Sequence, residues 1–489
     1  MNNDNETTRP DSSGTIIRAQ NGDILRYDAT GMVMVLSDRV IADIDRRLPG
    51  LTALRGNAEW IDPLCLGDID AWDLRRDGEW LLFGANLPGA QGPRQFRRLA
   101  ESDSAEIDPG IIADGAGPLR GLFSLGGARR ATGFDAPLDY PWHVLAPADD
   151  LGAVGHAGEK AQHCSALEDL RETTRDAAVA DVLAGRQHRS HKAMSLFVTR
   201  CETDSSASIS ELAESQAYAN LMTAIENLKA CADRLGRPAT LYGLAVEFVL
   251  EDVCSTSAQY RDGVFALLAQ LTCDIARAGL RRPPVVAVFD CGTHRLNDSP
   301  VLRAQWDLAW QGPEHGLNYS APGYMFKQDP FARPDTEALW QMAEMDACAL
   351  EALHAGEDWF CPIFLLAERE PDPAQIRVRA RSMGDLVLDP RDPFGAGAHF
   401  GFSLTGTTNH AALIGVTIAD DDPQDIILAF DMPPEGERLE VLYAFGMTVP
   451  RKGTDFPMAC GAVRDQWGHD SKTGSTLHRW ALPAALPVW

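Results

Sequence analysis

The sequence predicts a multidomain protein with a β-rich N-terminal module, a central α/β domain on a parallel sheet and a C-terminal all-β sandwich. A length of 489 residues exceeds one ordinary domain. Apolar strands alternate with amphipathic helices in the middle third, and short alternating segments fill both flanks. The expected ranges are a disordered arm at 1–13, the N-terminal module at 14–140, the α/β domain at 141–357 and the sandwich at 358–489.

The N-terminal module is expected to be mostly β-structure. Asn21 and Gly22 stand between two short apolar runs, which is the strongest short-range signal for a β-hairpin. Segments 31–44 and 79–87 continue as strands or short helices. The glycine-rich, basic segment from Ser124 to Gly133 lacks the strand, glycine spacing and helix of a phosphate-binding loop, so we expect a turn there.

The middle third alternates between helical and strand patterns, which predicts a parallel sheet with right-handed crossovers. A first helix is expected within 208–238, because apolar residues recur at intervals of three and four. Ser208 or Ser210 can cap its start, and Gly236 can end it. Two further helices are expected over 257–279 and 335–353, and buried strands over 240–250 and 283–291.

The C-terminal region returns to a strand pattern. Ile376, Val378 and Ala380 alternate with arginines along 375–381, which predicts a strand with one buried face. Segments 399–406, 411–419, 425–432 and 438–447 repeat this character between turn residues. Their spacing predicts a β-sandwich.

Composition excludes several classes of protein. The net charge of −26 disfavours a nucleic-acid partner, which requires a basic face. The ten cysteines are scattered without a C-x-x-C pair, a usage typical of a reducing compartment. The polar N-terminus lacks the apolar core of a secretory signal. No apolar run reaches the ~18 residues of a membrane span, so we expect no membrane insertion.

Four segments of the middle third carry a resemblance. They are "PADDLGAVG" (147–155), "DSSASISEL" (204–212), "VLEDV" (249–253) and "DPFA" (329–332). In order and spacing, residues 141–354 resemble SGNH (GDSL-like) hydrolases, in particular the sialate O-acetylesterase-like branch. That branch has a GQS-type nucleophile turn, a G-G-t-S-I segment, a Q-G-E-x-D segment and a D-x-x-H pair. The resemblance implies a flavodoxin-type parallel sheet.

The positions that would carry the hydrolase chemistry are replaced. A serine nucleophile needs a base within hydrogen-bond reach and donors aimed at the oxyanion. Asp150, or Asp149 in a shifted register, stands at the nucleophile position, and Ala332 stands where the resemblance implies the catalytic histidine. The Gln-Gly pair aligns with Val249 and Leu250. We therefore expect no catalytic residue, only vestigial positions at Asp150, Ser206, Val249, Glu251, Asp329 and Ala332.

Other constellations have ordinary structural interpretations. His188 and His191 could be a metal pair, but their basic neighbours favour a solvated loop. Segment 419–425 holds the carboxylates of a calcium loop without its glycine and terminal glutamate, so a β-turn is favoured. No metal and no cofactor are expected. A Ser-His-Asp site assembled through His156 or His315 stays open, as does an aromatic sugar platform from Tyr443, Trp467 and Trp489, although core packing is commoner.

Segment 460–483 extends the resemblance to the C-terminus. Its G-x-x-R-D pattern followed by a tryptophan-containing strand is similar to the closing motif of SGNH-containing proteins of alphaproteobacterial prophages and gene transfer agents. The resemblance implies a non-catalytic spike or fibre protein on the surface of a virion-like particle, made in the cytoplasm and released by lysis. The implied partners are other particle proteins, further copies of the chain as a homo-oligomer, and a host-surface polysaccharide. The alternative is an active carbohydrate O-acetylesterase with a rearranged site.

Overall fold

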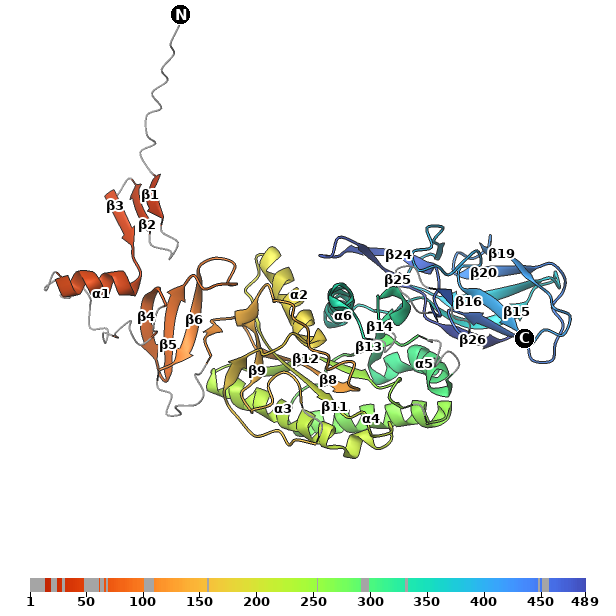
Figure 1. Ribbon diagram of the computed structural model, residues 1–489, viewed down its shortest axis with the longest axis horizontal. Helices are drawn as coiled ribbons and strands as arrows, with labels where there is room; N and C mark the ends of the chain where they lie inside the picture. Colours follow the sequence, from red (N-terminus) through yellow and green to blue (C-terminus); the bar gives the residue numbers. More distant parts are fainter. Residues whose placement is uncertain are drawn as a thin grey trace, which may run out of the picture.

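The structure is a computed structural model, and its modules lie in a row. A small antiparallel sheet stands at one end of the central α/β domain and the C-terminal sheets stand at the other (Figure 1). The predicted fold class is confirmed. None of the described helices is long and apolar enough to cross a membrane. The described residues are 14–18, 24–28, 31–47, 61, 66, 69–100, 110–155, 158–252, 254–291, 299–329, 333–446, 449–450 and 457–489.

The N-terminal module contains two antiparallel sheets. Strands β1 (Gly14–Arg18), β2 (Ile24–Asp28) and β3 (Gly31–Val35) form the first, and α1 (Asp38–Arg47) follows. Strands β4 (Ala71–Asp77), β5 (Trp80–Ala85), β6 (Arg94–Leu99) and β7 (Ile112–Ala113) form the second. β1 and β2 pair as predicted, while their turn residues Asn21 and Gly22 lie outside the described residues.

The central sheet has seven strands. Their order is β10 (Leu167–Asp169), β9 (Val144–Pro147), β11 (Leu196–Thr203), β8 (Leu119–Gly126), β12 (Ala239–Glu247), β13 (Val285–Phe289) and β14 (Leu317–Pro322). Only β10 is antiparallel to its neighbour. The five strands from β11 to β14 have the flavodoxin-type order, with β8 first in sequence and second in space. A division at 140/141 would place β8 in the N-terminal module, whereas β8 pairs with β11 along its whole length.

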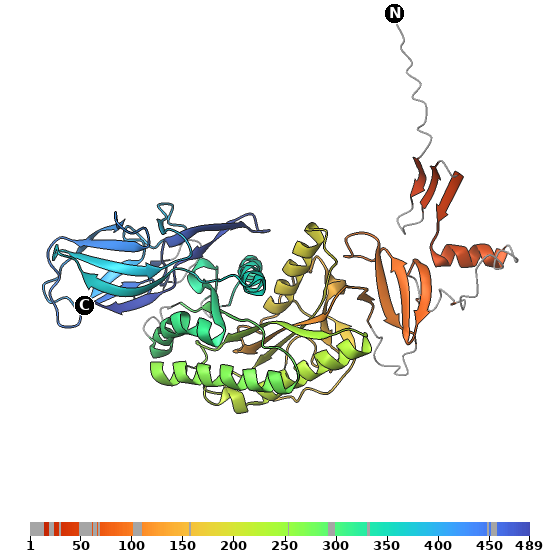
Figure 2. The ribbon, with the colours of Figure 1, turned by 180° about the vertical axis from the view of Figure 1, so that it is seen from behind.

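Helices cover both faces of this sheet. α2 (Arg175–Arg189) and α6 (Thr336–Ala355) pack together on one face, and α3 (Gln216–Arg234), α4 (Ser257–Arg277) and α5 (Pro300–Gln311) lie on the other (Figure 2). The three predicted helices are confirmed as α3, α4 and α6. The start of α3 was predicted wrongly: Ser215 caps it by accepting from Tyr218 N at 3.2 Å, while Ser208 Oγ donates to Glu211 at 2.8 Å in a separate turn.

The C-terminal region forms antiparallel sheets. The first contains β15 (Ile363–Arg369), β16 (Gln375–Arg381), β20 (Asp425–Phe430) and β19 (Leu413–Ile418). A second contains β18 (Phe402–Thr405), β21 (Glu440–Tyr443) and β26 (Ala484–Pro487), and a third contains β17 (Val387–Leu388), β24 (Val463–Asp470) and β25 (Thr476–Trp480). A short two-stranded sheet pairs β22 (Val449–Pro450) with β23 (Pro457–Met458). The predicted alternation in β16 is confirmed, because Ile376 and Val378 are fully buried.

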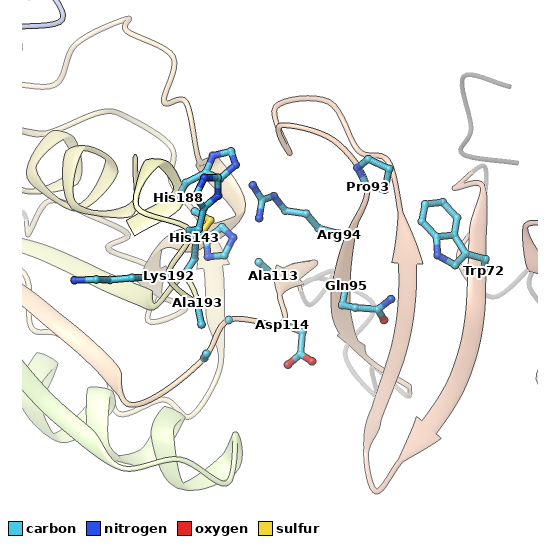
Figure 3. Close-up of a pocket in the computed structure, with 14 residues that line it drawn as sticks. Trp72, Pro93, Arg94, Gln95, Ala113, Asp114, His143, His188, Lys192 and Ala193 are labelled. Atoms are coloured by element: carbon cyan, nitrogen blue, oxygen red, sulfur yellow. The ribbon is translucent and has the colours of Figure 1, made fainter. Parts of the chain in front are cut away.

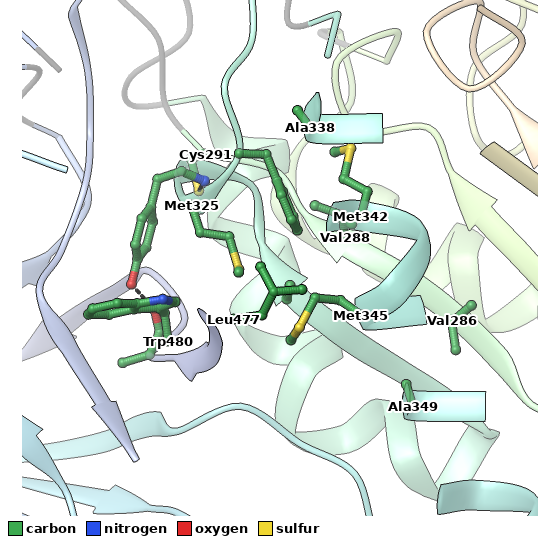
Figure 4. Close-up of a cluster of buried hydrophobic side chains, with 14 of the residues drawn as sticks. Val286, Val288, Cys291, Met325, Ala338, Met342, Met345, Ala349, Leu477 and Trp480 are labelled. Atoms are coloured by element: carbon green, nitrogen blue, oxygen red, sulfur yellow. Dashed lines mark hydrogen bonds between the residues drawn. The ribbon is translucent and has the colours of Figure 1, made fainter. Parts of the chain in front are cut away.

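One hydrophobic core joins the central domain to the C-terminal sheets (Figure 4). Met342 and Met345 of α6 belong to the same buried cluster as Leu477 and Trp480 of β25. Tyr324 Oη donates to the Ala481 carbonyl at 2.7 Å across this junction. Within the described residues, the two regions therefore share this core.

Candidate functional site

The carboxyl ends of the central strands are the place to look for a ligand. In open α/β sheets, ligands bind beyond these ends at the point where the strand order reverses. Here that point follows β8, whose chain continues as a turn over 128–131, inside the segment where a turn was predicted. Gly127 lies directly before this turn and donates its N–H to the Glu247 carbonyl at 3.0 Å. A Cβ on residue 127 would lie 1.9 Å from Glu251 Cδ, so any larger residue would have to displace this carboxylate.

Arg129 fills the space directly beyond β8. Its guanidinium donates two hydrogen bonds to the Asp290 carboxylate, at 2.9 and 3.2 Å, and Nε donates to Glu251 Oε1 at 3.3 Å. Both carboxylates are largely buried. Burial raises the pKa of Asp290 and the pKa of Glu251, and the nearby Arg129 opposes this effect. A bidentate arginine pair of this kind holds the turn in one geometry.

Arg130 lies deeper, in a second group of ion pairs. It pairs with Asp176, with Glu247 at 3.3 Å and with Asp346 at 3.5 Å. Arg175 pairs with Glu247 and, at 3.3 Å, with Asp346. All these side chains are at most 10% exposed. Buried charges are stable only when they are paired and hydrogen-bonded, so these residues act as one unit.

Carboxylates outnumber guanidinium groups in this network. Three arginines face five acidic side chains, namely Asp176, Glu247, Glu251, Asp290 and Asp346. Burial raises the pKa of Asp346 to about 7, against the opposing effect of Arg130. Ser320 Oγ donates to Asp346 at 2.6 Å. The excess negative charge is therefore relieved by retaining a proton at near-neutral pH.

The remaining cavity is small. It has a volume of about 20 Å³ and is lined by both Arg129 and Arg130, together with Glu247, Asp290 and Gln328. That volume holds about one water molecule, whereas small-molecule sites usually measure about 300–1,000 Å³. None of the described residues lining it is serine, cysteine or histidine. Among the described residues, the switch point therefore shows neither a nucleophile with its base nor room for a sugar ester; residues 292–298 and 330–332, which follow β13 and β14, lie outside them.

The structure places Asp150 away from this cavity. Asp150 follows β9 with φ of +68°, and Gln162 Nε2 donates to its carboxylate at 3.4 Å. Its neighbour Asp149 is buried in an ion pair with Arg200. Asp150 is not among the residues that line the cavity. Its strand β9 is also five positions in the sheet from β14, the strand before Asp329, which corresponds to about 24 Å at the usual strand spacing. The residue that follows the switch-point strand is Gly127, and the assignment of Asp150 stays a prediction.

The second and third predicted segments lie closer to the switch point. Ser206 donates both its N–H and its hydroxyl to Asp204 Oδ1, at 2.9 and 2.7 Å. Val249 is buried in the core. Glu251 makes the ion pair with Arg129 described above. This ion pair gives Glu251 a structural role.

Asp329 is engaged by a neighbour in its own loop. The Arg333 guanidinium donates to Asp329 Oδ2 at 2.9 and 2.7 Å, and Arg333 N donates to Oδ1 at 3.0 Å. Gln328, the preceding residue, lines the small cavity, so this loop does reach the switch point. Ala332 lies outside the described residues.

Sequence reasoning missed the network itself. Its acidic members Glu247 and Asp290 each close an apolar strand segment, and Arg129 and Arg130 follow Gly126 and Gly127. Two features of the sequence indicated the network. One is an acidic residue at the end of a buried strand, and the other is a Gly-Gly pair followed by two arginines at the end of another strand. It went unused because β8 was grouped with the N-terminal module.

The histidine pair lies in a different pocket. His188 ends α2 instead of lying in a loop, and Tyr140 Oη lies 2.8 Å from its Nδ1. His188, His191 and the buried His143 line a pocket of about 590 Å³ between α2 and the β4–β7 sheet, with Arg94 opposite (Figure 3). Burial lowers the pKa of His143 to about 4. The described residues contain no group of three or more His, Cys, Asp or Glu side chains placed to hold a metal ion.

The remaining candidates are structural. In segment 419–425, Asp421 and Asp425 accept from Arg377 at 3.0 and 2.9 Å in the turn between β19 and β20. Tyr443 is buried and Trp489 is exposed, so they form no common platform. His315 packs its ring 4.2 Å from that of Phe265, and His156 lies outside the described residues.

Comparison with known proteins adds a structural similarity. No protein-family profile and no curated protein matches the chain. Among solved structures, it is similar to XAC1771, a carbohydrate acetylesterase from Xanthomonas citri, at 13% identity, a TM-score of 0.47 and 96% coverage of both chains. NanS matches at 11% identity, a TM-score of 0.34, and 50% coverage of this chain and all of NanS. A protein of Arabidopsis thaliana matches at 14% identity and a TM-score of 0.34, over 48% of this chain and 98% of that protein.

Proposed function

We propose that this chain is a non-catalytic, SGNH-like pseudoenzyme that serves as a structural component of a phage-like particle. The observation that supports this most is the ion-pair network at the switch point. Arg129 and Arg130 occupy the position where a hydrolase needs an open site, and the cavity left beside them has a volume of about 20 Å³. Catalysis of acyl transfer needs a nucleophile, a base and an oxyanion stabiliser together.

The role in a particle follows from the arrangement around this closed site. The central domain is flanked by β-rich modules, and its core continues into the C-terminal sheets. A rigid body of this kind suits a spike or fibre, in which mechanical continuity matters more than domain motion. The closing motif in 460–483 supports a gene transfer agent or prophage as the setting. Host-surface polysaccharide is the proposed ligand of the exposed surface.

Turnover of acetyl esters tests the non-catalytic part. The purified chain and an Asp329→Ala variant are assayed on p-nitrophenyl acetate and on an O-acetylated sugar. We expect both to match the buffer rate. Turnover that disappears in the variant would contradict the proposal and favour the esterase alternative.

Sedimentation tests the particle part. Lysates of the source cells are separated on a density gradient and probed for the chain. Cosedimentation with DNA-containing particles is expected, and recovery only at the top of the gradient would contradict the structural assignment.

A further inference from the structure

A second pocket lies at the opposite edge of the central sheet. Its volume is about 770 Å³, within the range of small-molecule sites. Its lining comes from the starts of parallel strands, with Arg120 at β8, Tyr242 at β12, Pro284 before β13 and Gly316 before β14. Because the strands are parallel, these starts share one edge. We call this site the start-edge pocket, and it is separate from the switch-point network at the other ends.

Three arginines line the start-edge pocket. They are Arg120, Arg281 and Arg282. In the described part of the chain, no carboxylate oxygen lies within 4.0 Å of their guanidinium nitrogens. Among the described residues of the lining, Glu314 is the one that is acidic. This excess of positive charge is local, since the whole chain carries −26, and a concave basic surface concentrates anions.

Arg120 is held in a fixed orientation. Its Cζ lies 4.8 Å from the ring centre of Tyr242 and 6.0 Å from that of Phe197. The Tyr242 ring stacks on His354 with centroids 4.0 Å apart, and His354 Nε2 donates to the Tyr242 carbonyl at 2.6 Å. A guanidinium packed on aromatic rings keeps its five donors free for a carboxylate or phosphate.

Arg282 lies against bare backbone. A Cβ on Gly316 would come within 2.6 Å of Arg282 Nη2, so the glycine leaves the space that this guanidinium uses. Partial burial lowers the pKa of Arg282, although the residue remains exposed and its guanidinium is open to a ligand.

The three arginines are not explained by an interaction with the partial negative charge at helix C-termini. α4 and α6 both end near this edge, and cations favour helix C-termini. That effect acts within the last turn, whereas Arg281 and Arg282 follow the α4 cap, Ala278, by three and four residues. None of the three guanidinium groups donates a hydrogen bond to a carbonyl of the described residues.

We propose that the start-edge pocket binds an oligoanion, meaning a ligand with two or more carboxylate or phosphate groups, through Arg120, Arg281 and Arg282. The proposal does not depend on the particle role or on the absence of catalysis. Acidic oligosaccharides and polyphosphates share the required chemistry, and binding measurements distinguish between them.

Isothermal titration calorimetry of the full chain tests the proposal. The probes are tetragalacturonate, tripolyphosphate and uncharged maltotetraose. We expect one or both anions to bind, with an affinity that falls as salt is raised, and no binding of maltotetraose. The anion that binds more tightly identifies the source of the charged groups.

Matched variants locate the binding. Arg120→Gln and Arg282→Gln are each expected to weaken binding about tenfold or more, since a charged hydrogen bond is lost. Arg379→Gln, an exposed arginine on β16, is the control and should bind normally. Arg281→Gln, at an exposed position, replaces Arg120→Gln if circular dichroism shows that the latter is unfolded. Failure of both anions to bind, or equal binding by the pocket variants, would overturn the proposal.

Discussion

Arg129 holds Asp290 with two parallel hydrogen bonds, at 2.9 and 3.2 Å, across the end of the strand where an α/β protein of this topology usually keeps its ligand. Arg129 follows β8 and Asp290 follows β13, so this ion pair fills the space between the ends of two strands.

Removal of the Arg129 guanidinium is expected to destabilise the protein strongly. Arg129→Ala leaves Asp290 and Glu251 buried without their partner, and breaking a buried pair in this way costs about 3–5 kcal/mol. Urea denaturation measures the loss in the free energy of unfolding. The control Arg379→Ala removes an exposed ion pair with Glu368 and should change stability by at most about 1 kcal/mol. Equal small losses in both variants would show that the network is not structural.

The glycine at 127 is expected to be intolerant of a side chain. Gly127→Ala places a Cβ 1.9 Å from Glu251 Cδ and must displace this carboxylate from Arg129. We expect a loss of about 1–3 kcal/mol from overpacking. Gly384→Ala is the control, because an added Cβ there meets its nearest atom only at 4.0 Å. Thermal unfolding compares the two, and an equal melting temperature would contradict the packing described here.

Asp346 gives stability a specific pH dependence. Its pKa is about 7 in the folded protein, raised by burial from 3.8. Between these values the folded state keeps a proton that the unfolded state releases, so its contribution is full below pH 4 and is lost as pH rises through 7. Glu202, raised to about 7 by burial, acts in the same direction, and His143, lowered to about 4, acts in the opposite one.

The Asp346→Asn variant isolates this contribution. The variant should lose the fall in stability that Asp346 causes between pH 5 and 7, while the other titrating groups continue to act. The unfolding free energy is measured by urea denaturation at several pH values. An unchanged slope would show that Asp346 does not bind a proton in this range.

The shared core predicts that the central and C-terminal regions unfold together. Tyr324→Phe removes the hydrogen bond to the Ala481 carbonyl, at an expected cost of about 1–2 kcal/mol. Amide hydrogen exchange should become faster in both α6 and β25, which contribute to the same cluster. Faster exchange confined to one of them, or two separate unfolding transitions, would contradict a single core.

Local patterns predicted the elements well and their assembly poorly. α4 and α6 were visible from apolar periodicity, and β12 and β13 from buried apolar runs. α2 was missed because it is buried between α6 and the sheet. Its eleven buried residues include Arg175, Asp176 and Asp181, so it has no clean apolar stripe.

The site could not be assembled from sequence for a related reason. β8 is paired with two strands that lie far along the chain. Leu119 of β8 is opposite Leu196 of β11 and Ala239 of β12, which are about 75 and 120 residues further on. The residue pattern within 119–126 does not indicate which distant strands it pairs with. The ion pairs of Arg130 depend on that pairing, because Asp176, Glu247 and Asp346 come from three different elements.

Covalent labelling tests the central claim, that the switch point holds no working nucleophile, most directly. The folded chain is treated with a fluorophosphonate probe, which reacts with activated serines, and the adducts are located by mass spectrometry. The closed network predicts no stoichiometric label, with the folded chain and the Asp329→Ala variant giving the same background. One serine labelled stoichiometrically in the native chain, and unlabelled in Asp329→Ala, would contradict the account and show a working esterase site.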